Sequence, residues 1–179
     1  MTVPIISDSH GRSRRLSDIL NKLAVIGESP RELVFLGDGA QEIIRNLPDG
    51  IRLYAVCGNC DNYSGALSLD IIDGEGNAVP VERIEDIGGK RVFMTHGHKY
   101  GVKSGLSSAI SRAVLLGADV LLYGHTHEPH LQRIPAGSVF GDVTLSKDLH
   151  VFNPGALEKG SFGVLTVRNG EVLLSHGRV

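Results

Sequence analysis

The sequence predicts an α/β fold, a four-layer αββα sandwich in which two mixed β-sheets pack face to face with helices on their outer sides. Three observations predict it. In the first third of the chain, short apolar runs that are typical of buried strands alternate with helical repeats. The rest of the chain is dominated by short strands and turns, with one further helical repeat. A length of 179 residues suits one domain, so we expect a single domain over residues 1–179.

The first part of the chain has the order strand, helix, strand, helix, strand. We expect strands at residues 3–7, 33–36 and 53–56, each of them a continuous apolar run. Apolar residues from Leu16 to Leu23 follow the i, i+3, i+4, i+7 spacing of a helix, for which Ser13 is the candidate N-cap. A shorter helix is expected at residues 42–47. This order implies parallel pairing with right-handed crossovers.

The second part of the chain predicts more strands and one more helix. The strands are expected at residues 67–73, 81–87, 91–95, 119–123, 130–134, 139–145 and 149–152, followed by a hairpin over residues 169–170. The helix spans residues 106–113, with Ser104 as its candidate cap and Gly117 as its stop. We expect one sheet to be mostly parallel and the other to be more antiparallel.

The segment 128–152 is long for one connection and contains an added hairpin around residues 139–145. The simpler interpretation of this hairpin is a solvent-exposed addition. Our hypothesis is that it forms a contact between subunits of a homo-oligomer, or a rim over the active site.

Composition argues against several classes of protein. The net charge is −2, and the 18 lysines and arginines are scattered, unlike those of a dedicated nucleic-acid binder. No apolar run approaches the ~20 residues of a membrane span, and the first residues lack the features of a signal peptide. The 2 cysteines are too few for a disulfide framework. We therefore expect a cytoplasmic protein that does not act on membranes or nucleic acids.

Side chains that can bind metals follow the predicted strands. They are Asp8, His10, Asp38, Asn59, His96, His125 and His127. Ligands in α/β sheets bind beyond the carboxyl ends of the strands, so these donors should gather on one rim. Two cations about 3.5–4 Å apart can clamp a phosphoryl displacement and lower the pKa of a bound water to about 7. A mixture of imidazole and oxygen ligands suits Mn²⁺, Fe²⁺, Ni²⁺ or Zn²⁺ better than Ca²⁺ or Mg²⁺.

Together the motifs resemble a known family. They are Asp8-Ser-His10-Gly11, Gly37-Asp38, Gly58-Asn59-Cys60-Asp61, Thr95-His96-Gly97-His98, Gly124-His125-Thr126-His127 and, downstream, Asn153-Pro154-Gly155. In this order they resemble the five motifs of the calcineurin-like metallophosphoesterases, and in particular the small prokaryotic phosphodiesterases of the YfcE type. The resemblance extends over nearly the whole chain. Each motif alone is weakly specific, whereas the ordered set is strongly specific.

The resemblance implies a dinuclear centre and a reaction. One divalent ion would be bound by Asp8, His10 and His127, and the other by Asn59, His96 and His125, with Asp38 bridging the two. Two divalent ions are thus the expected cofactors, with Mn²⁺ as the first choice and Fe²⁺, Ni²⁺ or Zn²⁺ as alternatives. The implied activity is hydrolysis of a small phosphodiester by attack of a hydroxide that bridges the metals.

The third motif departs from the wider superfamily. Many members have histidine after the asparagine, where it helps to protonate the leaving group, and this chain has Cys60. A thiol with a pKa near ~8.5 is a poorer acid at neutral pH than imidazole, so His98 is the expected substitute. The predicted catalytic set is therefore Asp38, Asn59, His98 and Cys60. Cys57 and Cys60 also match a redox Cys-x-x-Cys, although we favour a strand-end residue and a site-wall residue.

Two other functions remain open from the sequence. One is a protein-interaction scaffold, because the same fold occurs in a eukaryotic retromer subunit that works chiefly by binding partners and has lost metal ligands. The other is a phosphomonoesterase or nuclease of the same superfamily. This chain keeps every expected ligand, which favours an enzyme with a small phosphoester substrate.

Overall fold

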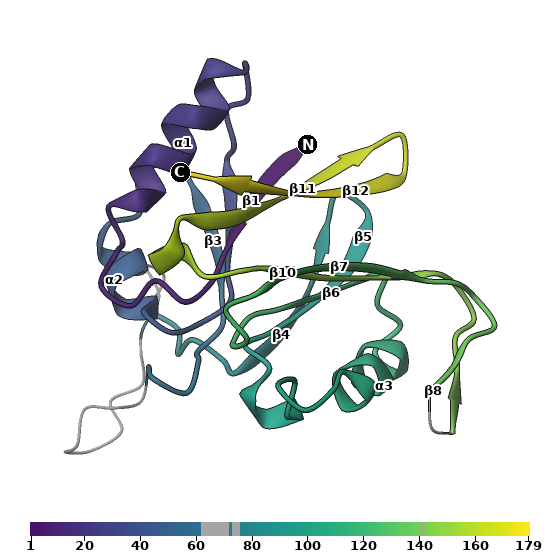
Figure 1. Ribbon diagram of the computed structural model, residues 1–179. Coiled ribbons are helices and arrows are strands. Elements are labelled where there is room, and N and C mark those ends of the chain that lie inside the picture. The colour runs from purple at the N-terminus through teal and green to yellow at the C-terminus, as the bar shows by residue number, and fades with distance from the viewer. Residues whose placement is uncertain (62–71, 73–75, 141) are drawn as a thin grey trace.

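Two five-stranded β-sheets face each other in the computed structural model, which describes residues 1–61, 72, 76–140 and 142–179 (Figure 1). The first sheet has the order β12-β11-β1-β2-β3, and the second has the order β4-β5-β6-β10-β7. The predicted packing of two mixed sheets is confirmed. The helices lie outside both sheets, so the four-layer arrangement is confirmed as well.

The first sheet is built from the two ends of the chain. Its strands are β1 (Thr2–Ile6), β2 (Glu32–Phe35), β3 (Arg52–Ala55), β11 (Ser161–Arg168) and β12 (Glu171–Arg178). The pairs β1–β2 and β2–β3 are parallel, as the β-α-β order predicted. The pairs β1–β11 and β11–β12 are antiparallel.

The second sheet comes from the middle of the chain. Its strands are β4 (Glu82–Ile87), β5 (Lys90–Thr95), β6 (Val120–Tyr123), β7 (Pro129–Ile134) and β10 (Leu149–Pro154). Parallel pairs join β6 to β5 and β10, while β4 and β7 add antiparallel edges. Each sheet thus has as many parallel as antiparallel pairs. The expectation of one mostly parallel sheet was wrong, because the β11–β12 hairpin adds two antiparallel pairs to the sheet that begins as β-α-β.

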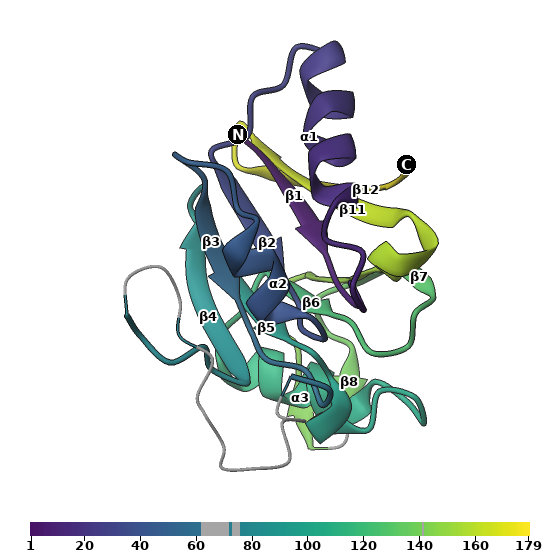
Figure 2. The ribbon, with the colours of Figure 1, turned by 90° about the vertical axis from the view of Figure 1, so that its left-hand side faces the viewer.

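Three apolar layers hold the four structural layers together. Along β2, Val34 packs between the sheets and Phe35 packs under the outer helices, as expected for a strand buried on both faces. Helices α1 (Arg15–Val25) and α2 (Ala40–Arg45) cover the outer face of the first sheet (Figure 2). Helix α3 (Ser107–Leu115) covers the second sheet, where it packs against Phe93 of β5.

The predicted helix stops were more accurate than the predicted caps. Gly117 has φ +66° just after α3, and its N–H donates to Val114 O, so the stop is confirmed. Neither Ser13 nor Ser104 caps a helix, because α1 begins after Arg14 and α3 after Leu106, both in helical backbone without a side-chain cap. The Ser13 hydroxyl accepts a hydrogen bond from Asn46 Nδ2 instead.

Two predicted features remain to be placed, together with two short turns that were not predicted. The expected strand at 67–73 lies almost wholly outside the described residues, of which Ile72 forms an isolated bridge with Ala78. The added hairpin consists of β8 (Val139–Phe140) and β9 (Val143–Thr144) and contacts α3. Short 3-10 turns, η1 (His98–Tyr100) and η2 (Leu157–Lys159), follow β5 and β10. None of the described helices is long and apolar enough to cross a membrane.

Candidate metal centre

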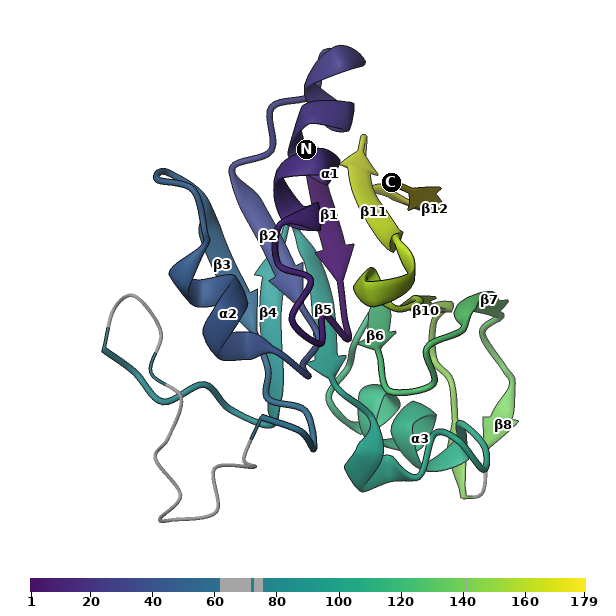
Figure 3. The ribbon, with the colours of Figure 1, turned by 60° about the vertical axis from the view of Figure 1, so that its left-hand side comes forward.

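The loops that follow β1, β2, β3, β5 and β6 meet at one end of the sandwich (Figure 3). Backbone hydrogen bonds join the first two loops directly, because the N–H groups of Asp8 and Ser9 donate to Gly37 O and Asp38 O at 2.9 Å. The two sheets face each other here, so carboxylates from the first sheet meet histidines from the second. The strand-end positions of the predicted donors therefore correspond to one place in the fold.

Asp8 has one satisfied and one unsatisfied carboxylate oxygen. The residue is fully buried, and its Oδ2 accepts hydrogen bonds from Ser7 Oγ at 2.5 Å and from His125 N at 3.2 Å. Its Oδ1 is buried without a hydrogen-bond partner. Imidazole nitrogens surround this oxygen, with His127 Nε2 at 3.2 Å and His10 Nε2 at 3.9 Å. A buried oxygen of this kind needs a cation or a donor to offset the loss of water.

Asp38 lies between the histidines of the two sheets. Its Oδ1 accepts the Cys60 N–H at 2.8 Å, while its Oδ2 lies 3.4 Å from His96 Nε2 and 3.9 Å from His10 Nε2. Only 2% of the residue is exposed. One carboxylate oxygen therefore stays fixed to the backbone while the other faces nitrogens on both sides, the arrangement expected of a bridging ligand.

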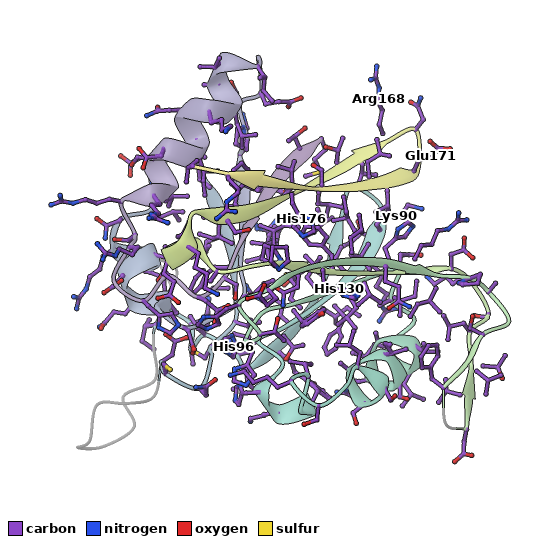
Figure 4. The ribbon with its side chains drawn as sticks, viewed as in Figure 1. Lys90, His96, His130, Arg168, Glu171 and His176 are labelled. Carbon is purple, nitrogen blue, oxygen red and sulfur yellow. The ribbon has the colours of Figure 1, made fainter. Side chains whose placement is uncertain are left out.

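His96 and His125 present their rings to each other. The Nδ1 of His96 lies 2.7 Å from Leu36 O, so this nitrogen carries the proton and Nε2 is left as the acceptor. His125 Nδ1 lies 3.2 Å from that Nε2. His96 is fully buried at the end of β5 (Figure 4). Two imidazole nitrogens are thus directed to the same small space beside the carboxylates.

The described residues form three groups whose ligand atoms lie within 4.8 Å of one another. They are Asp8 with His10 and His127, Asp8 with Asp38 and His96, and Asp38 with His10 and Cys60. The first two groups share Asp8 and consist of the carboxylate and imidazole donors that bind transition metals. Together with the unsatisfied Asp8 Oδ1, this donor set fits divalent cations.

The electrostatics of the site also suit a cation. Burial raises the pKa of Asp8 despite the neighbouring histidines, so the ionised carboxylate lacks sufficient positive charge around it. Burial and the charge of His96 lower the pKa of His125 to about 4, which keeps its ring neutral. A neutral His125 imidazole and a carboxylate short of positive charge are protonation states that suit a metal.

Three predicted residues are less firmly placed. Asn59 and Cys60 are exposed, and Asn59 Nδ2 donates to Cys60 Sγ at 3.2 Å. Within the described residues, Asn59 makes no hydrogen bond to another predicted ligand. His98 is partly buried, with its ring centroid 5.5 Å from that of His96 and 6.2 Å from that of His125, and its buried Nδ1 has no partner.

The backbone of the rim is strained at the donor positions. Five predicted ligands adopt positive φ, between +38° and +69°. They are Asp8, His10, Asp38, His125 and His127. Non-glycine residues seldom adopt such φ values, and each costs on the order of 1 kcal/mol or more. Each donor thus follows its strand through a sharp left-handed turn, which directs the side chain across the rim.

The glycines of the motifs allow close approach of the loops. A Cβ at Gly58 would lie 2.0 Å from Asp38 Oδ1, and a Cβ at Gly124 would lie 2.0 Å from Ser7 Oγ. Neither clash could be relieved cheaply, because both oxygens belong to the buried network. Glycine before Asn59 and before His125 is therefore a packing requirement of the carboxylate side of the site.

Two carboxylates outside the ligand set order the rim. Asp61 accepts hydrogen bonds from the N–H groups of Asp38, Gly39, Ala40 and Gly58 at 2.7–2.9 Å. Its carboxylate therefore joins the loops after β2 and β3. Glu158 Oε1 lies 3.0 Å from His127 Nδ1. Sequence reasoning missed Glu158, because only its place near the Asn-Pro-Gly motif distinguishes it from other exposed glutamates.

Three histidines outside the motifs do not join the donors. His130 Nδ1 pairs with Tyr123 O–H at 2.9 Å, and His176 stacks on Phe152 with its Nε2 at 2.8 Å from Asn153 O. Figure 4 shows His176 between the sheets and His130 on the α3 side of the second sheet, both away from His96. His150 lies near the start of β10, at the opposite end of that strand. All three are accounted for by packing.

Comparison with known proteins agrees with the geometry. Residues 1–176 match the family model of the calcineurin-like phosphoesterase superfamily domain. The probable metallophosphoesterase YsnB of Bacillus subtilis is 32% identical over 176 residues, which cover 94% of this chain and 86% of that protein. The phosphodiesterase YfcE of Escherichia coli is 28% identical over 193 residues, which cover 97% of this chain and 96% of that protein.

A solved structure shares the fold at lower identity. A single mutant of Vps29 from Entamoeba histolytica superposes with a TM-score of 0.63 at 20% identity, and the match covers 100% of this chain and 99% of that chain. At this identity the likeness concerns the arrangement of sheets and helices.

Proposed function

The chain belongs to the calcineurin-like phosphoesterase superfamily, and we propose that it is a dinuclear phosphodiesterase that hydrolyses small phosphodiesters. Membership makes it a metal-dependent phosphoester hydrolase. The similarity to YfcE, which is named a phosphodiesterase, supports the narrower activity. The observation that carries the proposal is the buried and unsatisfied Asp8 Oδ1 among imidazole nitrogens, because a buried carboxylate oxygen in this position requires a cation or a donor.

The group of Asp8, His10 and His127 supports the assignment of one ion, and the group of Asp8, Asp38 and His96 supports His96 as the first ligand of a second ion beside it. We propose that Asp8, His10 and His127 hold one ion, that His96 and His125 hold the other with Asn59, and that Asp38 lies between them. The contacts of Asp38 Oδ2 with His96 and His10 support the bridging role. Asn59, whose Nδ2 donates to Cys60 Sγ, would have to present its amide oxygen to the ion. We propose Mn²⁺ as the ion, with Fe²⁺, Ni²⁺ and Zn²⁺ as alternatives.

The protein groups have separate tasks in the reaction. Two divalent ions in such a centre activate water and offset the charge that grows on the phosphoryl oxygens. We propose that His98 holds the proton that passes to the leaving oxygen. Burial, together with a hydrogen bond to Asp38, raises the pKa of the Cys60 thiol to about 11, so the thiol is a weak donor at neutral pH.

A cavity of about 490 Å³ adjoins His127 and suits a small substituent of the substrate. Its other lining residues are Glu128, Pro129, Lys159, Ser161, His176, Gly177 and Arg178. Lys159 Nζ pairs with Glu128 at 3.3 Å, which leaves Arg178 to favour an anionic or polar group. We propose that the part of the diester beyond the scissile bond lies here.

The expectation of a cytoplasmic location stays a prediction.

The assignment is tested with Asp38→Ala and His96→Ala in protein loaded with Mn²⁺. Hydrolysis of bis-p-nitrophenyl phosphate should fall by about a thousandfold or more, because several kcal/mol of charge stabilisation depend on the centre. Arg168→Ala, which removes an exposed cation at the distant β11–β12 hairpin, is the control and should keep full turnover. Parallel assays with p-nitrophenyl phosphate separate a diesterase from a monoesterase. A wild-type protein that binds no metal and hydrolyses neither ester would support the scaffold.

A further inference from the structure

Glu158 contacts a predicted metal ligand without being one. It belongs to η2, and its Oε1 lies 3.0 Å from His127 Nδ1, with 32% of its side chain exposed. The other nitrogen of the same ring, His127 Nε2, lies 3.2 Å from the unsatisfied Asp8 Oδ1. The imidazole therefore stands between a partly exposed carboxylate and a fully buried one.

The segment that carries Glu158 is fixed to the rim through its backbone. The Glu158 N–H donates to Asp8 O at 3.1 Å, and the Leu157 N–H donates to Ser7 O at 2.8 Å. Arg15 Nη1 donates to Leu157 O at 3.0 Å, and the Leu157 side chain is fully buried. The position of the carboxylate is thus determined by the same strand end that carries Asp8.

Among the described residues, His127 is the one ion-pair partner of Glu158. Lys159, its neighbour in η2, pairs with Glu128 instead. The ring of His96 is oriented by a different acceptor, because its Nδ1 contacts the neutral carbonyl oxygen of Leu36. A carboxylate acceptor makes an imidazole a stronger base than a carbonyl acceptor does, and so a stronger metal ligand.

We propose that Glu158 is a positioning residue for one metal ion. Its carboxylate accepts the Nδ1 proton of His127, which fixes the tautomer and leaves the Nε2 lone pair for the ion that Asp8 Oδ1 would also bind. The metal-binding part of the inference rests on the proposed function, since it takes His127 as a ligand. The tautomer part concerns the metal-free protein and stands by itself.

The tautomer is measured by long-range ¹H–¹⁵N correlation spectra of metal-free protein. Wild-type His127 should be the Nδ1–H tautomer, and Glu158→Ala should shift it toward Nε2–H. Glu158→Gln retains an acceptor oxygen without the charge and should keep most of the wild-type form. The control is Glu171→Gln, which removes an exposed carboxylate at the distant β11–β12 hairpin and should leave the spectrum unchanged. The same tautomer population in Glu158→Ala and wild type would overturn the proposal.

Metal affinity is measured by calorimetric titration with Mn²⁺. Glu158→Ala should weaken one of the two ions by 10–100-fold, the range typical of partners that orient ligands, and should leave the other unchanged. Glu158→Gln should lose less affinity, and Glu171→Gln should lose none. A general structural defect would weaken both ions and lower the apo melting temperature. Unchanged affinity in Glu158→Ala overturns the positioning role, whereas absence of Mn²⁺ binding in wild type overturns the proposed function and leaves the tautomer measurement to decide on Glu158.

Discussion

Asp8 and Asp119 are carboxylates at opposite ends of the sandwich, and their surroundings differ in one decisive respect. Asp119 precedes β6, with Lys147 Nζ 2.6 Å from its Oδ1 and the Arg91 N–H donating to its Oδ2 at 2.8 Å. Both oxygens are satisfied, and the pKa is lowered: burial raises it, but the hydrogen bonds from Lys147 and Arg91 and the charges of Lys147 and Lys90 together outweigh burial. Asp8 has one orphan oxygen and a raised pKa. The protein's own groups satisfy both oxygens of Asp119, whereas Asp8 Oδ1 is left for a ligand to satisfy.

The backbone repeats this contrast. In the described residues, Asn169 is the one non-glycine residue with positive φ outside the rim, and it precedes Gly170 in the β11–β12 turn. Asparagine before glycine is the ordinary choice for a two-residue hairpin, so φ +52° there costs little. The strained residues of the rim are instead aspartates and histidines. Backbone strain is therefore concentrated at residues whose side chains must point in directions that a regular strand does not allow.

The β8–β9 hairpin lies toward the Asp119 end of the sandwich, away from the metal donors. Strand β7 begins opposite Pro154 and ends opposite Leu149, so it carries the chain away from the metal donors before the hairpin starts. Figure 1 places β8 beside α3, on the far side of the molecule from the rim loops. The hypothesis that this hairpin forms a rim over the site is therefore wrong. A role in subunit contact stays a prediction.

The largest expected effect is that of a substitution at Asp8, which tests the contrast between Asp8 and Asp119. Asp8→Asn should lower Mn²⁺-dependent turnover by about a thousandfold, because it removes a charged ligand. It should also stabilise the metal-free protein at pH 7 by on the order of 1 kcal/mol, since the amide oxygen can keep the bonds from Ser7 and His125 without a buried charge. Turnover assays and chemical denaturation measure the two effects.

The sign of that stability change depends on pH. Because the folded pKa of Asp8 is raised, ionisation weakens the fold as pH rises above the unfolded value near ~3.9. The advantage of Asp8→Asn should therefore disappear in acid. A metal-free variant that is less stable than wild type at pH 7 would show that Asp8 is satisfied within the protein and would remove the contrast.

A smaller effect should separate His98 from Cys60 as proton donors. Burial and the charge of His96 lower the pKa of His98, so its protonated form is a strong acid. His98→Ala should cost about a hundredfold with an unactivated alkyl ester, and much less with a p-nitrophenyl ester, which needs little acid help. Cys60→Ser should cost only a few-fold with both. Equal losses across the two leaving groups in His98→Ala would mean that His98 binds substrate instead of giving a proton.

The sequence predicted where the donors lie far better than how they are held. Strand-end positions sufficed to place Asp8, Asp38 and His96 on one rim, because the carboxyl ends of parallel strands meet at the same edge of a sheet. The left-handed turns after the strands could not be foreseen, since their φ values arise from contacts between loops distant in sequence. Glu158 was missed for the same reason, as its partner lies 31 positions earlier.

Local rules failed where tertiary contacts supplied an alternative. Ser13 was predicted to cap α1, but the preceding chain is already turned by the bond from Arg12 N to Ser9 O. The cap has no task there, and the hydroxyl accepts from Asn46. Pairing in the sheets was mispredicted because antiparallel edges depend on which strands return to the sheet. Apolar periodicity records burial and carries no information about strand direction.

The smallest expected effect concerns Asp119, whose ion pair with Lys147 lies near the surface. Asp119→Asn should leave turnover unchanged and lower the stability at pH 7 by about 0.5–1 kcal/mol, the usual range for an exposed pair. The folded pKa of Asp119 is lowered, so its contribution is present above the unfolded value near ~3.9 and is lost as pH falls through the folded value. The stability difference between wild type and variant should therefore vanish in acid.

Thermal melts from pH 7 to pH 2.5 measure this difference. The control is Asp49→Asn, which changes an exposed carboxylate in the turn after α2. A loss of turnover in Asp119→Asn would mean that the Asp119 end of the sandwich is coupled to the metal centre. The two ends could then no longer be treated as independent.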